Sequence, residues 1–285
     1  MNITLGTTTV PFTFWTPAHG AVFNTIFSLD TETTLIDDNH PWITPAYVLG
    51  AACDGTTGYF ITRQHIAAFL KAHQGLPMAL HNAAFDLDVL QLVVGKQLDI
   101  YTAEDAGEVW DTMLLHQLNC LGSEGHVAYG GGQSTLETCA LRYLGVDLPK
   151  DPKDSAGDEV RTSYSKWLNK APETIEPVYL EYLAKDALAT ILVYDKVQSE
   201  LAELLAGSDD AFNYQSPEWL QEQVSRWGPQ TYHTQLKGSI VLRAITANGI
   251  HVDRSKVGDL KEALEAERTV LLEALREHCY RALLR

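Results

Sequence analysis

The chain has 285 residues, of which 45% are hydrophobic and 20% are charged, and its net charge is −16 at pH 7 with histidine neutral. This composition excludes a collagen-like or wholly disordered chain, and the sequence has no apolar run of about 18 residues that could cross a membrane. The negative charge argues against broad, sequence-blind neutralisation of nucleic-acid phosphates. The length predicts two domains, or one large domain with an appendage.

The charge is divided unevenly along the chain. Residues 1–210 contain 28 acidic and 11 basic residues, whereas residues 211–285 contain 9 acidic and 10 basic residues. The difference predicts two modules, an acidic one and a nearly neutral one. A solvated acidic surface accounts for most such charges, and the alternative is that some carboxylates cluster to bind divalent cations.

Cysteine usage and the first residues of the chain both favour a cytoplasmic location. The four cysteines form no C-x-x-C pair, so neither a structural zinc site nor a disulfide framework is expected. The first residues lack the basic and continuous apolar segments of a secretion signal.

Strand and helix patterns alternate over the first 145 residues, after a threonine-rich start without a clear pattern. Apolar, β-branched runs predict strands at 21–29, 47–53, 58–62 and 77–80. Helical periodicity predicts helices at 64–73, 82–94, 111–121 and 135–145. This order predicts an α/β fold with a mixed sheet and flanking helices.

The second half is predicted to be mostly helical. A glycine-rich stretch at 122–134 and a polar, proline-punctuated stretch at 148–177 precede a long helix at 178–205. Residues 207–233 indicate a connector, and the helices predicted at 238–248 and 253–285 form a C-terminal helical extension. The last helix carries an apolar stripe that would be exposed unless it meets more protein.

Three separate patterns contain acidic residues in positions suited to chemistry. Asp30 and Glu32 end the first predicted strand, and residues two apart in an extended chain point to the same side. Two neighbouring carboxylates repel each other unless a cation lies between them, and oxygen ligands suit Mg²⁺ or Mn²⁺. Taken alone, such a D-x-E pattern is more typical of the start of a loop.

The second pattern is the start of the helix predicted at 82–94. Asn82 is a good N-cap residue, and Asp86 follows in or just beyond the first turn. Simple capping and a favourable interaction with the helix dipole explain Asp86 as well as a ligand role does.

The third pattern lies in the long helix predicted at 178–205. Tyr182 and Asp186 are four residues apart, hence on one helix face, and their neighbours are apolar. A carboxylate in such surroundings needs a partner that offsets its desolvation. A surface tyrosine–aspartate pair is the alternative.

Together the three patterns supply four carboxylates and one phenol. Four carboxylates can hold two divalent ions at the spacing of roughly 4 Å used in phosphodiester hydrolysis. The sequence therefore predicts a two-metal hydrolytic site.

The motifs Phe27–Thr33 (FSLDTET), His81–Asp86 (HNAAFD) and Tyr182–Ala187 (YLAKDA) resemble, in this order, the 3′–5′ exonuclease domain of family A DNA polymerases. Asp111–Leu115 (DTMLL) and Leu136–Gly145 (LETCALRYLG) resemble two further helices of that domain. The resemblance implies an RNase H-like fold with four catalytic carboxylates over about residues 24–205. The tyrosine four residues before the last aspartate is typical of the tyrosine subclass.

The resemblance also implies a role for each matching residue. Asp30 would bridge two Mg²⁺ (or Mn²⁺) ions, Glu32 and Asp186 would complete the first ion's ligands, and Asp86 would hold the second, directly or through water. Tyr182 would orient the attacking water. Asn82 and Phe85 match positions that contact the terminal nucleotide, and Leu35 is aligned more loosely with a residue that wedges against the last base.

A second resemblance covers residues 236–285, which look like the segment that opens the polymerase domain and the start of its thumb. We therefore expect an exonuclease domain at 1–206, a connector at 207–235 and a helical thumb-like segment at 236–285. No palm or fingers follow in the sequence, so polymerase activity is not expected.

The leading hypothesis is a metal-dependent 3′–5′ exonuclease that shortens single-stranded DNA to nucleoside 5′-monophosphates. One alternative is a non-polymerising front fragment or subunit of a family A polymerase, which would act as a proofreading module or dock a separate polymerase through residues 211–285. Self-association through the same residues is a further alternative. Another is an RNA-trimming exonuclease, which would share every catalytic residue.

Overall fold

The computed structural model describes residues 1–125, 132–149, 151–206, 222, 226–228, 231–249 and 253–283. The chain forms two units, Met1–Ala247 and Asn248–Arg285. Most of the connector expected at 207–235 lies outside the described residues, as does part of the glycine-rich stretch at 122–134.

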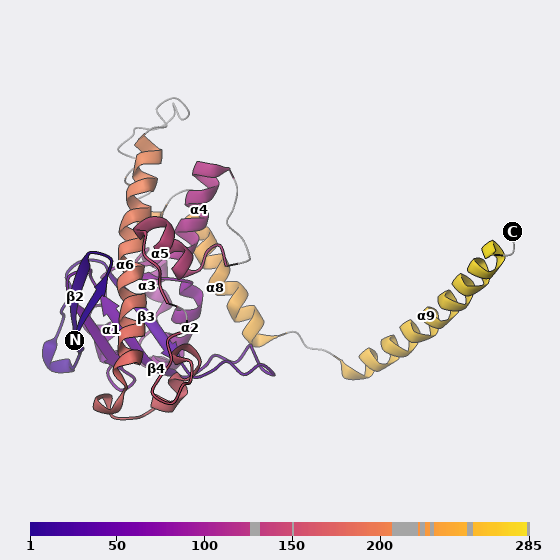
Figure 1. Ribbon diagram of the computed structural model, residues 1–285, viewed down its shortest axis with the longest axis horizontal. Coiled ribbons are helices and arrows are strands. Elements are labelled where there is room, and N and C mark those ends of the chain that lie inside the picture. Colours follow the sequence, from indigo (N-terminus) through magenta and orange to yellow (C-terminus); the bar gives the residue numbers. More distant parts are fainter. Residues whose placement is uncertain are drawn as a thin grey trace. The chain divides into compact units, whose positions relative to one another are not determined.

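The described residues of the first unit contain a seven-stranded mixed sheet with the order β1-β2-β5-β4-β3-β6-β7 (Figure 1). β4 is antiparallel to both its neighbours, whereas β3, β6 and β7 run parallel to one another. The strands are β1 (Asn2–Leu5), β2 (Thr8–Phe14), β3 (Phe27–Thr33), β4 (Tyr47–Cys53), β5 (Gly58–Thr62), β6 (Met78–Leu80) and β7 (Val109–Asp111). The predicted α/β fold, a mixed sheet with flanking helices, is confirmed.

Three of the strands differ from the prediction. The strand expected at 21–29 begins at Phe27 and continues to Thr33, so Asp30 and Glu32 lie inside it rather than at its end. β1 and β2 form an antiparallel hairpin in the start that showed no clear pattern. Their buried residues do alternate with exposed ones, for example Ile3 and Leu5, but the many threonines weaken that contrast in the sequence.

The hairpin joins the sheet through a parallel pairing of β2 with β5. Gly58 of β5 lies under the ring of Phe12, and a Cβ at Gly58 would come within 2.3 Å of that ring. Glycine at this position therefore lets the two strands approach.

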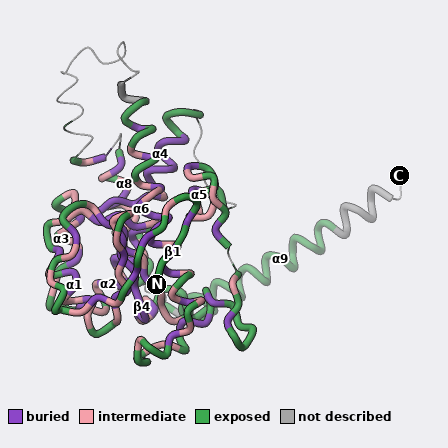
Figure 2. Tube along the Cα trace, turned by 60° about the vertical axis from the view of Figure 1, so that its left-hand side comes forward, coloured by how far each residue is buried: buried purple, intermediate pink, exposed green. Residues whose placement is uncertain are grey.

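Helices cover both faces of the sheet. α6 (Pro177–Ala206) packs across β3 and β4, and the Ser28 hydroxyl donates to the Ala187 carbonyl of α6 at 2.7 Å. α1 (Ile66–Ala72) and α2 (Ala83–Val94) pack against the sheet and each other. Figure 2 shows the strands and the middle of α6 as largely buried. The remaining helices of this region are α3 (Tyr101–Asp105), α4 (Thr112–Glu124), α5 (Leu136–Leu144) and the 3-10 turns Pro17–His19, Gly95–Gln97, Val160–Thr162, Tyr164–Trp167 and Pro172–Thr174.

The starts of α2 and α4 depend on one carboxylate. Asn82 precedes α2 as predicted, but it has a left-handed backbone (φ 67°) and its side chain forms no cap hydrogen bond. The buried Asp111 carboxylate accepts instead from the Asn82 and Ala83 N–H groups at 3.1 and 2.9 Å. It also accepts from the Met113 and Leu114 N–H groups at 2.9 and 3.3 Å, so Asp111 caps both helices.

α8 (Tyr232–Asn248) begins earlier than the helix predicted at 238–248 and packs within the first unit up to Ala247. The Tyr232 hydroxyl accepts from the Asp111 N–H and donates to the Val109 carbonyl at 3.3 Å, and the Tyr232 ring stacks on Trp110. The first unit thus includes residues that the sequence assigned to a thumb-like segment.

The second unit contains α9 (Arg254–Leu283). Its described apolar side chains are exposed, Leu260, Leu264 and Leu271 among them. None of the described helices is long and apolar enough to cross a membrane.

Candidate active site

Strand β3 places two acidic side chains on one face of the sheet. Asp30 and Glu32 are both half-buried, and they are two residues apart on the strand, so they point to the same side. This is the face that packs on α6, because Ser28, two residues before Asp30, bonds to α6. Thr31 lies between the two acids and points to the opposite face.

α6 brings the third acidic side chain to this face. One carboxylate oxygen from each of Asp30, Glu32 and Asp186 lies within 4.8 Å of the other two. Tyr182 precedes Asp186 by one helical turn, and its hydroxyl donates a hydrogen bond to the Asp186 carboxylate.

Asp86 reaches the group from the other side of β3. It lies in the first turn of α2 and is buried, and its carboxylate accepts a 2.6 Å hydrogen bond from the Thr31 hydroxyl. Asp86 thus meets β3 through Thr31, whereas Asp186 lies beside Asp30 and Glu32.

The four carboxylates disfavour one another's charge. Burial raises the pKa of Asp30 to about 7. Burial and then the charge of Asp30 raise the pKa of Glu32, of Asp86 and of Asp186 well above the usual range. Among the described ion pairs, none joins a lysine or arginine to these four groups. Closely spaced oxygen ligands with this unfavourable charge fit divalent cations such as Mg²⁺ or Mn²⁺.

A cleft of about 850 Å³ opens over these groups. The sequence-predicted residues all line it, namely Asp30, Glu32, Leu35, Asn82, Phe85, Asp86, Tyr182 and Asp186. The side chain of Leu35 is 62% exposed at the cleft, whereas Phe85 is half-buried beneath the Arg243 guanidinium, which lies 4.9 Å from the centre of its ring. The structure thus brings together side chains from β3, α2 and α6 that are up to about 150 residues apart in the sequence.

Sequence reasoning missed three residues at this site. Thr31 donates a hydrogen bond to Asp86. The sequence feature that could have indicated this role is a polar residue on the face of the strand opposite Asp30 and Glu32. Asp111 caps α2 beside Asp86, and its position directly before a predicted helix was the signal. Arg161 lines the cleft from the 3-10 turn Val160–Thr162, in a stretch where the sequence showed no clear pattern.

Two histidines hold one wall of the cleft, and both are hydrogen-bonded. His81 bonds to the Thr112 hydroxyl at 2.8 Å and to the Ser134 carbonyl at 3.0 Å. His116 bonds to the Gln133 carbonyl at 3.2 Å. Burial lowers the pKa of His81 to about 4, so this histidine is neutral at pH 7. The two bonds hold residues 133–134 against the cleft, which they line.

Comparison with known proteins gives one family match. Residues 23–202 match a family model described as 3′–5′ exonuclease. The comparison with curated proteins found no match. Residues 236–285 lie outside the family match, so no polymerase context is shown.

Solved structures of low identity are also similar to this chain. The EXO domain of Nibbler from Aedes aegypti is 13% identical, with 75% of this chain and 94% of that chain covered and a TM-score of 0.49. NrnC from Brucella melitensis bound to pGG is 17% identical, with 79% and 97% covered and a TM-score of 0.46. RNase D from Escherichia coli is 17% identical, with 76% and 44% covered and a TM-score of 0.46.

Proposed function

Because this chain belongs to the 3′–5′ exonuclease family, a family of phosphodiester hydrolases, we propose that it removes nucleoside 5′-monophosphates one at a time from the 3′ end of single-stranded nucleic acid. The observation that carries the proposal is the meeting of Asp30, Glu32, Asp86, Tyr182 and Asp186 in one cleft.

In the proposed reaction a water oxygen attacks the phosphorus of the last phosphodiester bond. The bond from phosphorus to the 3′ oxygen of the preceding nucleotide breaks, which leaves a new 3′ hydroxyl and a free 5′-monophosphate. When bound, two divalent cations supply positive charge that stabilises the attacking and the leaving oxygens. Asp30, Glu32 and Asp186 would hold one ion, and Asp30 with Asp86 the other.

Tyr182 orients the water and does not deprotonate it. Burial and the neighbouring Asp186 and Glu32 carboxylates raise the pKa of Tyr182 far above 10, so its hydroxyl keeps its proton at neutral pH. A neutral hydroxyl can donate to Asp186 and accept from water at the same time.

Three residues would bind the terminal nucleotide. Phe85 offers an aromatic face for a base, Leu35 offers an exposed apolar side chain, and Asn82 offers an amide for the sugar or phosphate. Stacking and apolar contact accept any base, as a sequence-blind exonuclease requires.

The test is degradation of a 5′-labelled oligonucleotide with Mg²⁺ or Mn²⁺. We expect shortening from the 3′ end in single-nucleotide steps, and none with EDTA or with Asp30→Ala. Lys170→Ala, which changes an exposed residue outside the cleft, is the matched control and should keep wild-type activity. Shortening that persists in EDTA or in Asp30→Ala would exclude the proposed mechanism.

The sugar of the substrate is a separate question that the same assay answers. The DNA hypothesis depended on the polymerase-like reading of residues 236–285, which the family match does not include. An RNA-trimming exonuclease would use the same catalytic residues. Initial rates on DNA and RNA oligonucleotides of the same sequence distinguish the two hypotheses. A rate at least tenfold higher on RNA would favour the RNA-trimming exonuclease over the DNA exonuclease.

A further inference from the structure

The charge of the cleft does not suit a polyanionic substrate. Eight carboxylates line it, those of Asp30, Glu32, Asp38, Asp86, Glu137, Asp151, Glu159 and Asp186. Two divalent cations would offset four negative charges, which leaves the remaining carboxylates facing the phosphates of the incoming strand. Among the described residues that line the cleft, Arg161 is the only lysine or arginine.

Arg161 lines the same cleft as the carboxylates. Its charge lowers the pKa of Glu32, of Asp186 and of Tyr182, against the larger raising effect of burial. Its side chain is exposed, and none of the described ion pairs includes it. A guanidinium in this position can bind phosphate oxygens through two hydrogen bonds.

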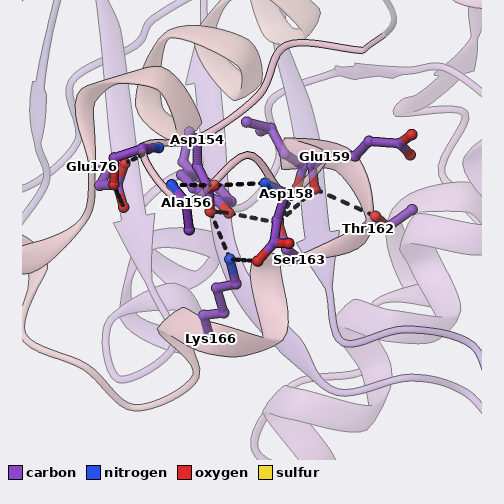
Figure 3. Close-up of polar contacts among 11 residues, drawn as sticks. Asp154, Ala156, Asp158, Glu159, Thr162, Ser163, Lys166 and Glu176 are labelled. Carbon is purple, nitrogen blue, oxygen red and sulfur yellow. Dashed lines mark hydrogen bonds and ion pairs between the residues drawn. The ribbon is translucent and has the colours of Figure 1, made fainter.

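The turn that carries Arg161 is held by a polar network centred on Asp154 (Figure 3). One oxygen of the buried Asp154 carboxylate accepts from the Ala156 and Asp158 N–H groups, both at 2.9 Å. The other accepts from the Lys166 ammonium at 2.6 Å and from the Tyr179 hydroxyl at 2.9 Å. The Lys166 ammonium also lies 2.5 Å from the Asp158 carboxylate, so it links the two ends of the segment 154–158.

The same network connects the turn to α6. The Ser163 hydroxyl oxygen lies 2.5 Å from both the Tyr179 hydroxyl oxygen and the Glu159 carbonyl oxygen, and its one proton is shared between these two acceptors because Tyr179 donates to Asp154. Tyr179 lies three residues before Tyr182 on α6. Arg161 and Tyr182 are thus both positioned by α6, one through this network and the other directly.

We propose that Arg161 binds a backbone phosphate of the substrate strand, as a further substrate-binding residue, and that the contacts among Asp154, Lys166 and Tyr179 position it. This inference rests on the proposed exonuclease function. Arg161 would contact the substrate without being a metal ligand or a base-stacking residue.

Salt dependence tests the phosphate contact. Each contact to a single strand contributes about 0.7 to the slope of log affinity against log salt concentration. We expect Arg161→Gln to lower kcat/KM on a short oligonucleotide about 10- to 100-fold at low salt and to reduce that slope by about 0.7. Arg161→Lys, which keeps a charge, should restore most of the slope.

Lys170→Gln is the matched control, because it removes an exposed charge from the same region but outside the cleft. It should leave both quantities unchanged. If Arg161 acted only on the carboxylates, Arg161→Gln would change the Mg²⁺ concentration needed for half-maximal activity and leave the salt slope as it is, which would overturn the proposal. A wild-type protein that cleaves no oligonucleotide would overturn the proposed function instead.

The positioning network is tested with Lys166→Met and Lys166→Arg. We expect Lys166→Met to raise KM and reduce the salt slope as Arg161→Gln does, and Lys166→Arg to rescue both. Thermal unfolding monitors whether each variant is folded. A folded Lys166→Met protein with wild-type KM and slope would show that the network does not position Arg161.

Discussion

At the scale of single residues, the candidate site combines carboxylates whose negative charges are unfavourable without a cation. Asp30, Glu32, Asp86 and Asp186 all have raised pKa values, because burial penalises the ionisation of each and the charge of Asp30 adds to this at the other three. Such carboxylates destabilise the folded chain at neutral pH when no metal is bound. Function and stability therefore oppose each other at these positions.

The first prediction concerns the stability of metal-free protein. Asp30 has its pKa raised from 3.8 to about 7, so the folded state binds more protons than the unfolded state between these values. The free energy of unfolding therefore falls as pH rises from about 4 to 7. At pH 8 with EDTA, Asp30→Asn should raise the free energy of unfolding by roughly 1 to 4 kcal/mol.

Urea unfolding with and without Mg²⁺ measures this effect. Glu173→Gln changes an exposed carboxylate and should have little influence on stability. Mg²⁺ should stabilise the wild type and do so less for Asp30→Asn, since a ligand that binds only the folded state stabilises it. A loss of stability in Asp30→Asn at pH 8 would contradict the raised pKa.

At the scale of elements, the ends of helices determine where the site residues lie. Asp111 follows β7 and accepts four backbone N–H groups at the starts of α2 and α4. Asp86 lies in the first turn of the helix that Asp111 caps. The D-T pattern at 111–112 thus has a structural role at the start of the helix that carries Asp86.

The second prediction follows from this double cap. Asp111→Ala leaves four backbone N–H groups without their acceptor, and should lower the free energy of unfolding by roughly 2 to 4 kcal/mol. Thr135→Ala removes the single cap of α5, whose hydroxyl accepts from the Thr138 N–H at 3.3 Å, and should cost about 1 kcal/mol. Denaturant titration of both variants measures the difference, and equal losses would contradict the double role of Asp111.

The third prediction concerns the contact between α8 and α2. The Arg243 guanidinium lies over the Phe85 ring and pairs with Asp88 at 2.8 Å, and Asp88 also accepts from the Thr44 hydroxyl at 2.6 Å. Arg243→Met should remove the contact that holds the Phe85 ring in place. We expect KM to rise about 3- to 10-fold with kcat nearly unchanged, because the lost interaction stabilises the bound substrate and the transition state equally.

Lys237→Met is the control for Arg243→Met. Lys237 lies on the same helix and pairs with the exposed Asp105 at 2.8 Å, away from the cleft. Steady-state kinetics on one oligonucleotide should show no change in KM for this variant. A similar KM in both variants would mean that Arg243 does not influence Phe85.

At the scale of the whole molecule, the site belongs entirely to the first unit. Met1–Ala247 contains the sheet, the cleft and the part of α8 that contacts β7 and α2. The second unit contains α9, whose described apolar side chains are exposed. The exonuclease reaction is therefore expected to need only the first unit.

The fourth prediction is that a chain ending at Asn248 keeps the activity. Its kcat/KM on an oligonucleotide should lie within about twofold of the full chain, because no residue of the cleft is removed. Thermal unfolding should show a similar midpoint for both chains. A loss of folding or activity on truncation would show that the second unit supports the site.

Self-association or polymerase docking through residues 211–285 stays a prediction. The exposed stripe on α9, which includes Leu260, Leu264 and Leu271, is the kind of surface that partners cover. Sedimentation velocity of the full chain and of the chain ending at Asn248 tests self-association. A monomer in both cases would remove that part of the hypothesis.

The sequence by itself determined the main strands, the long helix and the candidate residues, because hydrophobic periodicity and motif spacing are local properties. β4 and β5 have the predicted bounds, and the three motifs alone indicate Asp30, Asp86 and Asp186. Only the tertiary structure decided that Thr31 supports Asp86, that Asp111 caps two helices and that Arg161 lines the cleft with the carboxylates. These relations join residues 28 to 129 positions apart, and such contacts depend on how β3, α2, β7 and α6 pack around one sheet.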